Sequence, residues 1–355
     1  MGKTTFTVPE SLDLAETLEF SRDVAAVERD DEFVFDFSKN ANIEPFPMLL
    51  LASDIRLLMR RFPESRVACS NYRQMTYAAN MGFFQSFGLD YGKAPGKAKG
   101  GVRYIPVTIF DREILEREAA IKGVEIHEEL EAQSKRMAVL LCGEHEGSVF
   151  DTLTYAVREI VRNVIEHSKS PRFGICAQYW PNRKRVEVAI LDRGIGLRAS
   201  LANNPHLDAS DDKRAINYAL MPAVSGTAFK GASNRTKGPW ANSGFGLYMT
   251  SRICRNGGNF FVASGESGML LTTKAEGKRY FACNFGGTAI RMVLRTDPMA
   301  NLKESLDIYR SEGYAIQQRY KEIVNIDPSS ASLMLSEDFD LSVWEKVLKK
   351  LKGNT

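Results

Sequence analysis

The chain has 355 residues, enough for two domains, and its 44% apolar and 26% charged residues are ordinary for a protein with a sizeable core. The formal net charge is only +3, so the sequence carries no strong nucleic-acid signal. The longest apolar run, residues 45–52, is far too short to cross a bilayer, and no membrane partner is expected.

The cysteines and the N-terminus indicate the cellular compartment. Five cysteines are scattered singly, and neither they nor the four histidines have metal-ligand spacing. The N-terminus has no basic segment followed by an apolar stretch, which a signal peptide would show. We therefore expect reduced thiols and a cytoplasmic location.

The first third of the chain predicts a small α/β domain after an acidic lead-in. Residues 1–30 are rich in Asp and Glu and are expected to be poorly packed or to form one short helix. Strand and helix patterns then alternate through residues 31–122, which favours an α/β domain. Strands are predicted at residues 32–37, 66–70 and 103–110, and helices at residues 47–61, 75–87 and 112–122.

Residues 123–297 predict a second domain, and residues 298–355 a helical C-terminal tail. Ser148 and Asp151 fit a capping box that opens a long helix. Residues 222–241 are rich in Gly, Ser and Lys without a regular period, which favours a lid or disorder. The predicted helices cover residues 126–141, 148–168 and 245–255, and the predicted strands cover residues 173–180, 185–191, 259–263, 269–273 and 288–294.

Three polar residues on the long predicted helix share one face. Glu159, Asn163 and His167 follow one another at intervals of four, and an apolar stripe occupies another face. Taken alone, this pattern also fits a solvated polar face.

Two glycine motifs downstream make a ligand site the better interpretation. Asp192, Gly194 and Gly196 follow a predicted strand, so a carboxylate stands beside backbone without Cβ atoms, where a flat ring bearing an amine could approach closely. Gly244 and Gly246 open a predicted helix, whose N-terminal N–H groups and dipole favour phosphate.

The order of these motifs resembles the GHKL (Bergerat-fold, histidine kinase-like) ATPase superfamily. Glu-x-x-x-Asn on a helix, Asp-x-Gly-x-Gly after a strand, a long lid and Gly-x-Gly-Leu opening a helix are similar to the anti-sigma-factor kinase form, in which a His also follows the Asn by four. The resemblance covers roughly residues 126 to 296. It implies an α+β fold in which an α/β sandwich has a mixed sheet with helices on one face. One departure is Asn242, which stands where the family has the first glycine of its Gly-x-Gly-x-Gly motif.

The resemblance implies ATP and Mg²⁺ as cofactors and gives each motif residue a role. Asn163 would be the Mg²⁺ ligand, and Glu159 would orient or deprotonate the attacking water or hydroxyl as the catalytic residue. Asp192 would bind the adenine amine. The other cofactor-binding residues would be His167, Gly194, Gly196, Gly244, Gly246, Leu247 and Thr288. The lid residues Lys230, Arg235 and Lys237 either reach a phosphate or remain exposed loop cations.

Residues 31–122 resemble a STAS-like domain, the fold of anti-sigma-factor antagonists, although a generic α/β domain explains their element order almost as well. Those antagonists carry a phosphorylated Ser where a loop enters a helix. Here residues 42–47 contain no Ser, so this domain is not expected to be a phosphorylation substrate.

Three functions fit the sequence. The first is hydrolysis of Mg-ATP coupled to lid closure and regulation of a protein partner. The second is a Ser/Thr protein kinase that acts on a STAS-type partner, and the third is a nucleotide-gated binding module without turnover. A homodimer is an open alternative for the partner.

Overall fold

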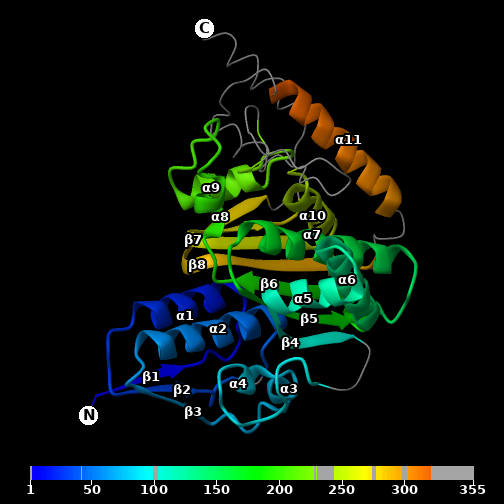
Figure 1. Ribbon diagram of the computed structural model, residues 1–355. Coiled ribbons are helices and arrows are strands. Elements are labelled where there is room, and N and C mark those ends of the chain that lie inside the picture. Colours follow the sequence, from blue (N-terminus) through cyan, green and yellow to red (C-terminus); the bar gives the residue numbers. More distant parts are fainter. Residues whose placement is uncertain are drawn as a thin grey trace.

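The computed structural model describes residues 2–40, 42–98, 103–227, 229, 244–273, 277–297 and 302–320. These residues form two β-sheets with helices between them and on the outer face of the larger sheet (Figure 1). The α+β class expected from the sequence is confirmed.

The smaller sheet has three parallel strands in the order β1-β2-β3. They are β1 (Lys3–Thr7), β2 (Glu32–Asp36) and β3 (Arg66–Ser70), and helices α1 (Leu14–Ala26) and α2 (Pro45–Arg61) connect them. Of the two expectations for residues 1–30, the poorly packed lead-in is wrong and the helix is confirmed: the first residues supply helix α1, and they also supply an edge strand, β1, that was not predicted. Two of the acidic side chains, Asp13 and Glu16, form the capping box at the N-terminus of α1.

Helix α2 lies between the two sheets. It contacts strands of the larger sheet as well as α1, and its first part, residues 45–52, is buried on all sides of the helix. A helix that is apolar all round belongs in a core, which explains the apolar run at residues 45–52. Phe46 contacts Phe261 of the larger sheet edge-to-face at 5.5 Å between ring centroids, so the two layers share one core.

The larger sheet has five strands in the order β4-β5-β6-β8-β7, and every adjacent pair is antiparallel. The strands are β4 (Tyr104–Asp111), β5 (Arg172–Trp180), β6 (Arg185–Asp192), β7 (Asn259–Leu271) and β8 (Lys278–Arg295). The predicted mixed sheet is therefore wrong. Strand β4 was expected in the N-terminal domain but pairs with β5, so the boundary at residues 122 and 123 does not separate the two sheets.

Both faces of the larger sheet are covered, which corrects the expectation of helices on one face. Helices α1 and α2 pack on the face that points toward the smaller sheet (Figure 1). The central strand β6 is consequently buried on both faces from Val186 to Asp192 and reads as a nearly continuous apolar run. The helices on the outer face are α6 (Ile126–Cys142), α7 (Ser148–His167), α8 (Gly196–Leu201), α9 (Asp212–Ala219) and α10 (Gly246–Arg255), with α5 (Arg112–Lys122) against α6.

The remaining differences from the predicted elements are local. The predicted helix at residues 75–87 is split into α3 (Thr76–Asn80) and α4 (Phe83–Ser86) because Gly82 adopts a left-handed φ of +81°. Short helices α8 and α9 were not predicted, and the strands expected at residues 259–263 and 269–273 form one strand, β7. Within the predicted tail, the structure describes α11 (Leu302–Tyr320), which contacts α7 and α10.

A buried ionic cluster ties α2 to the larger sheet. The carboxylate of Glu187, fully buried on β6, accepts hydrogen bonds from the backbone N–H of Phe46 at 3.0 Å and from Arg291 at 2.9 Å. It also pairs with Arg185, which forms a bidentate pair with Glu44 at 2.7 Å. The negative charge at the N-terminus of α2 is favourable because it complements the helix dipole.

Candidate functional site

Helix α7 carries the first predicted motif against the outer face of the sheet. Leu153, Val157 and Ile160 are fully buried, and the helix is strongly amphipathic in its pattern. The predicted capping box is wrong: the N-cap is Gly147, and no side-chain hydrogen bond caps this end. Packing of the apolar stripe, rather than the cap, therefore holds the helix in place.

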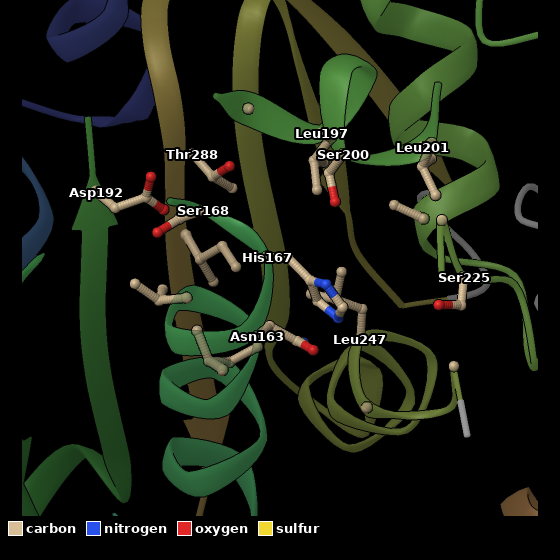
Figure 2. A pocket seen from close by; sticks show the side chains of 18 of the residues that line it. Asn163, His167, Ser168, Asp192, Leu197, Ser200, Leu201, Ser225, Leu247 and Thr288 are labelled. Carbon is tan, nitrogen blue, oxygen red and sulfur yellow. The ribbon is translucent and has the colours of Figure 1, made fainter. Parts of the chain in front are cut away.

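Asp192 stands at the end of β6, almost completely buried at 2% exposure. One carboxylate oxygen accepts a hydrogen bond from the backbone N–H of Gly194 at 2.8 Å. Across the ladder Asp192 faces Thr288 on β8, and the two side chains lie together at one side of the site (Figure 2).

The glycines after Asp192 are required by close approach. A Cβ atom at Gly194 would overlap the carbonyl oxygen of Ser168, to which Ile195 donates its N–H at 2.8 Å. Gly196 has a left-handed φ of +74°, and a Cβ there would lie 2.8 Å from the hydroxyl of Ser264. The loop thus passes directly over the end of α7.

The second glycine motif brings the N-terminus of α10 against α7. Gly244 has φ of +69°, and its carbonyl accepts the N–H of Ala223 at 3.0 Å. A Cβ atom at Gly246 would lie 2.7 Å from a carboxylate oxygen of Glu159 and 3.5 Å from the side-chain nitrogen of Asn163. Gly246 therefore lets the helix end meet the polar face of α7.

These segments enclose one cavity. Its walls include Asn163, His167, Asp192, Gly196, Gly244, Gly246, Leu247 and Thr288, all of them residues that the sequence predicts. Figure 2 shows Asn163 and His167 on α7, Leu247 on α10, and Asp192 and Thr288 on neighbouring strands around the same space. We call this space the outer cavity.

The outer cavity is narrow. It measures about 80 Å³. Ligand pockets usually enclose about 300–1,000 Å³, so the outer cavity would have to widen to admit a ligand of ordinary size.

Two predicted residues do not line the outer cavity. Gly194 supports it from behind through its hydrogen bond to Asp192. Glu159 lies beside Gly246, one helical turn before Asn163, and its carboxylate is ion-paired with Arg158 at 3.0 Å. The predicted base is thus next to the α10 N-terminus but turned partly toward a cation.

Sequence reasoning missed three polar residues in the wall: Ser168, Ser200 and Ser225. Ser168 directly follows His167 and ends α7, so its position could have been inferred from the helix boundary. Ser200 comes from α8 and Ser225 from the first part of the predicted lid, residues 222–241, and neither belongs to a motif. Among the residues that the structure describes, no Lys or Arg lines the cavity, and the lid residues Lys230, Arg235 and Lys237 lie outside those residues.

Burial changes the acid–base properties of the site. Burial raises the pKa of Asp192 to about 6, although the Gly194 hydrogen bond, the nearby Arg193 and the Thr288 backbone oppose the rise. Burial also lowers the pKa of His167, and the neighbouring Glu166 carboxylate only partly compensates. At neutral pH the site therefore offers a carboxylate that is poorly solvated and a neutral imidazole.

A magnesium ion fits this donor set only together with phosphate. Mg²⁺ keeps several waters and takes few protein oxygens, so the Asn163 amide in the wall suffices as one ligand. Within the described part of the chain, no three His, Cys, Asp or Glu side chains gather closely enough to hold a metal ion by themselves.

Comparison with known proteins adds no assignment. No family model matches the chain, and no curated protein matches it significantly. None of the helices in the described ranges has the length and apolar character needed to span a membrane.

Proposed function

We propose that the outer cavity binds Mg-ATP and that the protein hydrolyses it. The observation that supports this most is convergence: residues from α7, the end of β6, β8 and the N-terminus of α10, far apart in sequence, line one space. A solvated polar face, the alternative for Glu159, Asn163 and His167, would not place two of them in a cavity wall with Asp192.

The chemistry of the walls matches an adenine nucleotide from one end to the other. Asp192 provides a buried acceptor for an exocyclic amine, beside glycine backbone that leaves room for a flat ring. The N-terminus of α10 provides N–H groups and a positive dipole end for phosphate. Asn163 lies between them, where it would hold Mg²⁺ against the phosphates.

Glu159 favours turnover over simple binding. Its carboxylate lies beside Gly246, at the phosphate end of the proposed nucleotide, where a base could orient water. Its pairing with Arg158 has to loosen for that role. Transfer of the phosphate to a Ser or Thr of a STAS-type partner uses the same groups and is distinguished only by experiment.

The test is incubation of the protein with γ-labelled ATP and Mg²⁺, with and without a STAS-type protein. We expect labelled free phosphate. Glu159→Ala should abolish its release and leave ATP binding intact, whereas Asp192→Asn should weaken binding about 10- to 100-fold, because a hydrogen bond to a charged group contributes about 1.5–3 kcal/mol. Glu116→Gln, on the exposed surface of α5, is the matched control.

Each assignment has its own contrary outcome. ATP hydrolysis by Glu159→Ala would show that Glu159 is not the base. Unchanged ATP affinity in Asp192→Asn would show that Asp192 does not contact the adenine. Label on the partner protein in place of free phosphate would make the protein a kinase. Bound ATP with neither product would make it a nucleotide-gated module.

A further inference from the structure

A second and larger cavity lies on the opposite face of the five-stranded sheet. It measures about 440 Å³ and is bounded by α2 on one side and by β4, β5 and the end of β6 on the other. Figure 1 shows α2 below β6, on the side away from α7 and α10. We call it the inner cleft. Its volume is within the range of small-molecule pockets.

The body of the inner cleft is apolar and incompletely covered. Leu49, Val107 and Leu191 form buried parts of its wall. Leu57 of α2 and Ile109 of β4 also line it, yet they remain 43% and 41% exposed. A ligand that covered these two side chains would remove apolar surface from water, which is favourable.

Guanidinium groups gather in the same cleft. Arg56 and Arg60 follow each other by one turn on α2, and Arg172 enters from β5. Burial lowers the pKa of Arg56, and the positive charges of Arg60 and Arg172 lower it further. Like charges at this helical spacing are mutually destabilising, so an anion among them would relieve a repulsion that the protein alone retains.

Existing acidic residues leave part of this positive charge uncompensated. Asp111 accepts from Arg172 at 2.9 Å. Arg56 donates only to a neutral group, the carbonyl oxygen of Ser86 at 3.0 Å, and Arg60 has no ion pair with any described residue. Among the described residues, the other carboxylates that line the cleft are those of Asp192 and of Glu113, on the first turn of α5.

Arg193 closes the inner end. It donates to the hydroxyl of Ser53 at 2.8 Å and pairs with Asp54, while its Nη1 atom is buried and has no hydrogen-bond partner among the residues described. An unsatisfied buried donor is costly, and a ligand acceptor or a water would satisfy it.

We propose that the inner cleft is a second ligand site, which binds an amphipathic organic anion: an apolar body with one carboxylate, phosphate or sulfonate group. The acidic group lies among Arg56, Arg60 and Arg172, whose planar forks match such oxygens, and the apolar body covers Leu57 and Ile109. This site lies on the opposite face of the sheet from the proposed nucleotide site. Asp192 borders both spaces, but the residues proposed to hold the anion do not line the outer cavity, and the proposal does not depend on nucleotide binding.

Two matched probes test the proposal by isothermal titration calorimetry. The anion is 1-anilinonaphthalene-8-sulfonate, and its neutral counterpart is N-phenyl-1-naphthylamine, which has the same rings without the sulfonate. We expect one anion per chain, bound about tenfold tighter than the neutral probe. Arg56→Met and Arg60→Met should each lower the affinity for the anion about tenfold and leave the affinity for the neutral probe unchanged.

Two further variants locate the probes. Leu57→Asn, at an exposed position, should lower the affinity for both probes, because it removes part of the apolar wall. Arg66→Met removes the same charge from the edge strand β3, at a residue that does not line the cleft, and should change the affinity for neither probe. Unchanged binding of the neutral probe by the arginine variants shows that the cleft is still formed in them.

Three outcomes would overturn the proposal. Equal affinity for the two probes would show that the cleft does not recognise the acidic group. Undiminished binding of the anion to both Arg56→Met and Arg60→Met would place the probe elsewhere on the protein. Binding of neither probe would exclude a small-molecule site, as expected if a protein segment filled the cleft.

Discussion

Replacing Asp192 with Asn should stabilise the ligand-free protein at neutral pH even though it impairs the proposed site. The carboxylate is 2% exposed, and burial raises its pKa from 3.8 to about 6. Above pH 6 the folded protein therefore carries a charge that is better solvated in the unfolded chain. An Asn removes that charge and still accepts the N–H of Gly194.

The pH dependence supplies the magnitude. Below pH 6 the folded protein binds a proton at Asp192, whereas the unfolded chain binds it only near pH 3.8, so this carboxyl adds stability as the pH falls. Between pH 7.5 and pH 4.5 these two pKa values correspond to about 2 kcal/mol, at 1.36 kcal/mol per pKa unit. The gain is lost again as the pH rises through 6.

Urea unfolding of both proteins at pH 7.5 and pH 4.5 measures the effect. Other buried groups also have shifted pKa values: burial raises the pKa of Asp54 and lowers that of His167, which loses its stabilising contribution as the pH falls. The difference between wild type and Asp192→Asn cancels them. Wild type should gain about 2 kcal/mol relative to the variant on acidification. A relative change near zero, or of opposite sign, would refute the raised pKa of Asp192.

Two further predictions concern the architecture around the site. Gly194→Ala should destabilise the protein by at least about 3 kcal/mol in urea unfolding, since the new Cβ overlaps the Ser168 carbonyl, and a stable variant would show that the loop can move off the end of α7. Glu187→Gln should cost about 3 kcal/mol because Arg185 and Arg291 lose a fully buried carboxylate, whereas Glu32→Gln, in an exposed pair on β2, should cost under about 1 kcal/mol. Equal losses in these two Glu variants would mean that the cluster around Glu187 contributes no more than a surface pair.

The residues of the outer cavity were predictable because each motif is local. Asn163 and His167 follow from helical spacing, and Asp192 and Gly246 mark the junctions of one strand and one helix. The ends of β6 and α10 lie within one residue of the predicted bounds. The Asp-x-Gly that follows the strand and the glycine that begins the helix are local signals that mark these ends in the sequence.

Long-range pairing was not predictable in the same way. The pattern of β4 indicates a strand but not its partner, and only the folded chain shows that it pairs with β5, about seventy residues later in the sequence. Likewise, the apolar run of α2 signals burial without indicating that a second sheet lies above it. The inner cleft, which depends on both placements, left no motif in the sequence.

The position of α2 between the two sheets also bears on modularity. Phe46 and Leu49 are buried against a sheet that belongs, in sequence terms, to the other half of the chain. Neither half could be exchanged or inherited alone without exposing one side of this helix or one face of the sheet. Although the sequence pattern suggests two parts, the two halves share one core, so substitutions on one side of α2 have to be compatible with the packing on the other side.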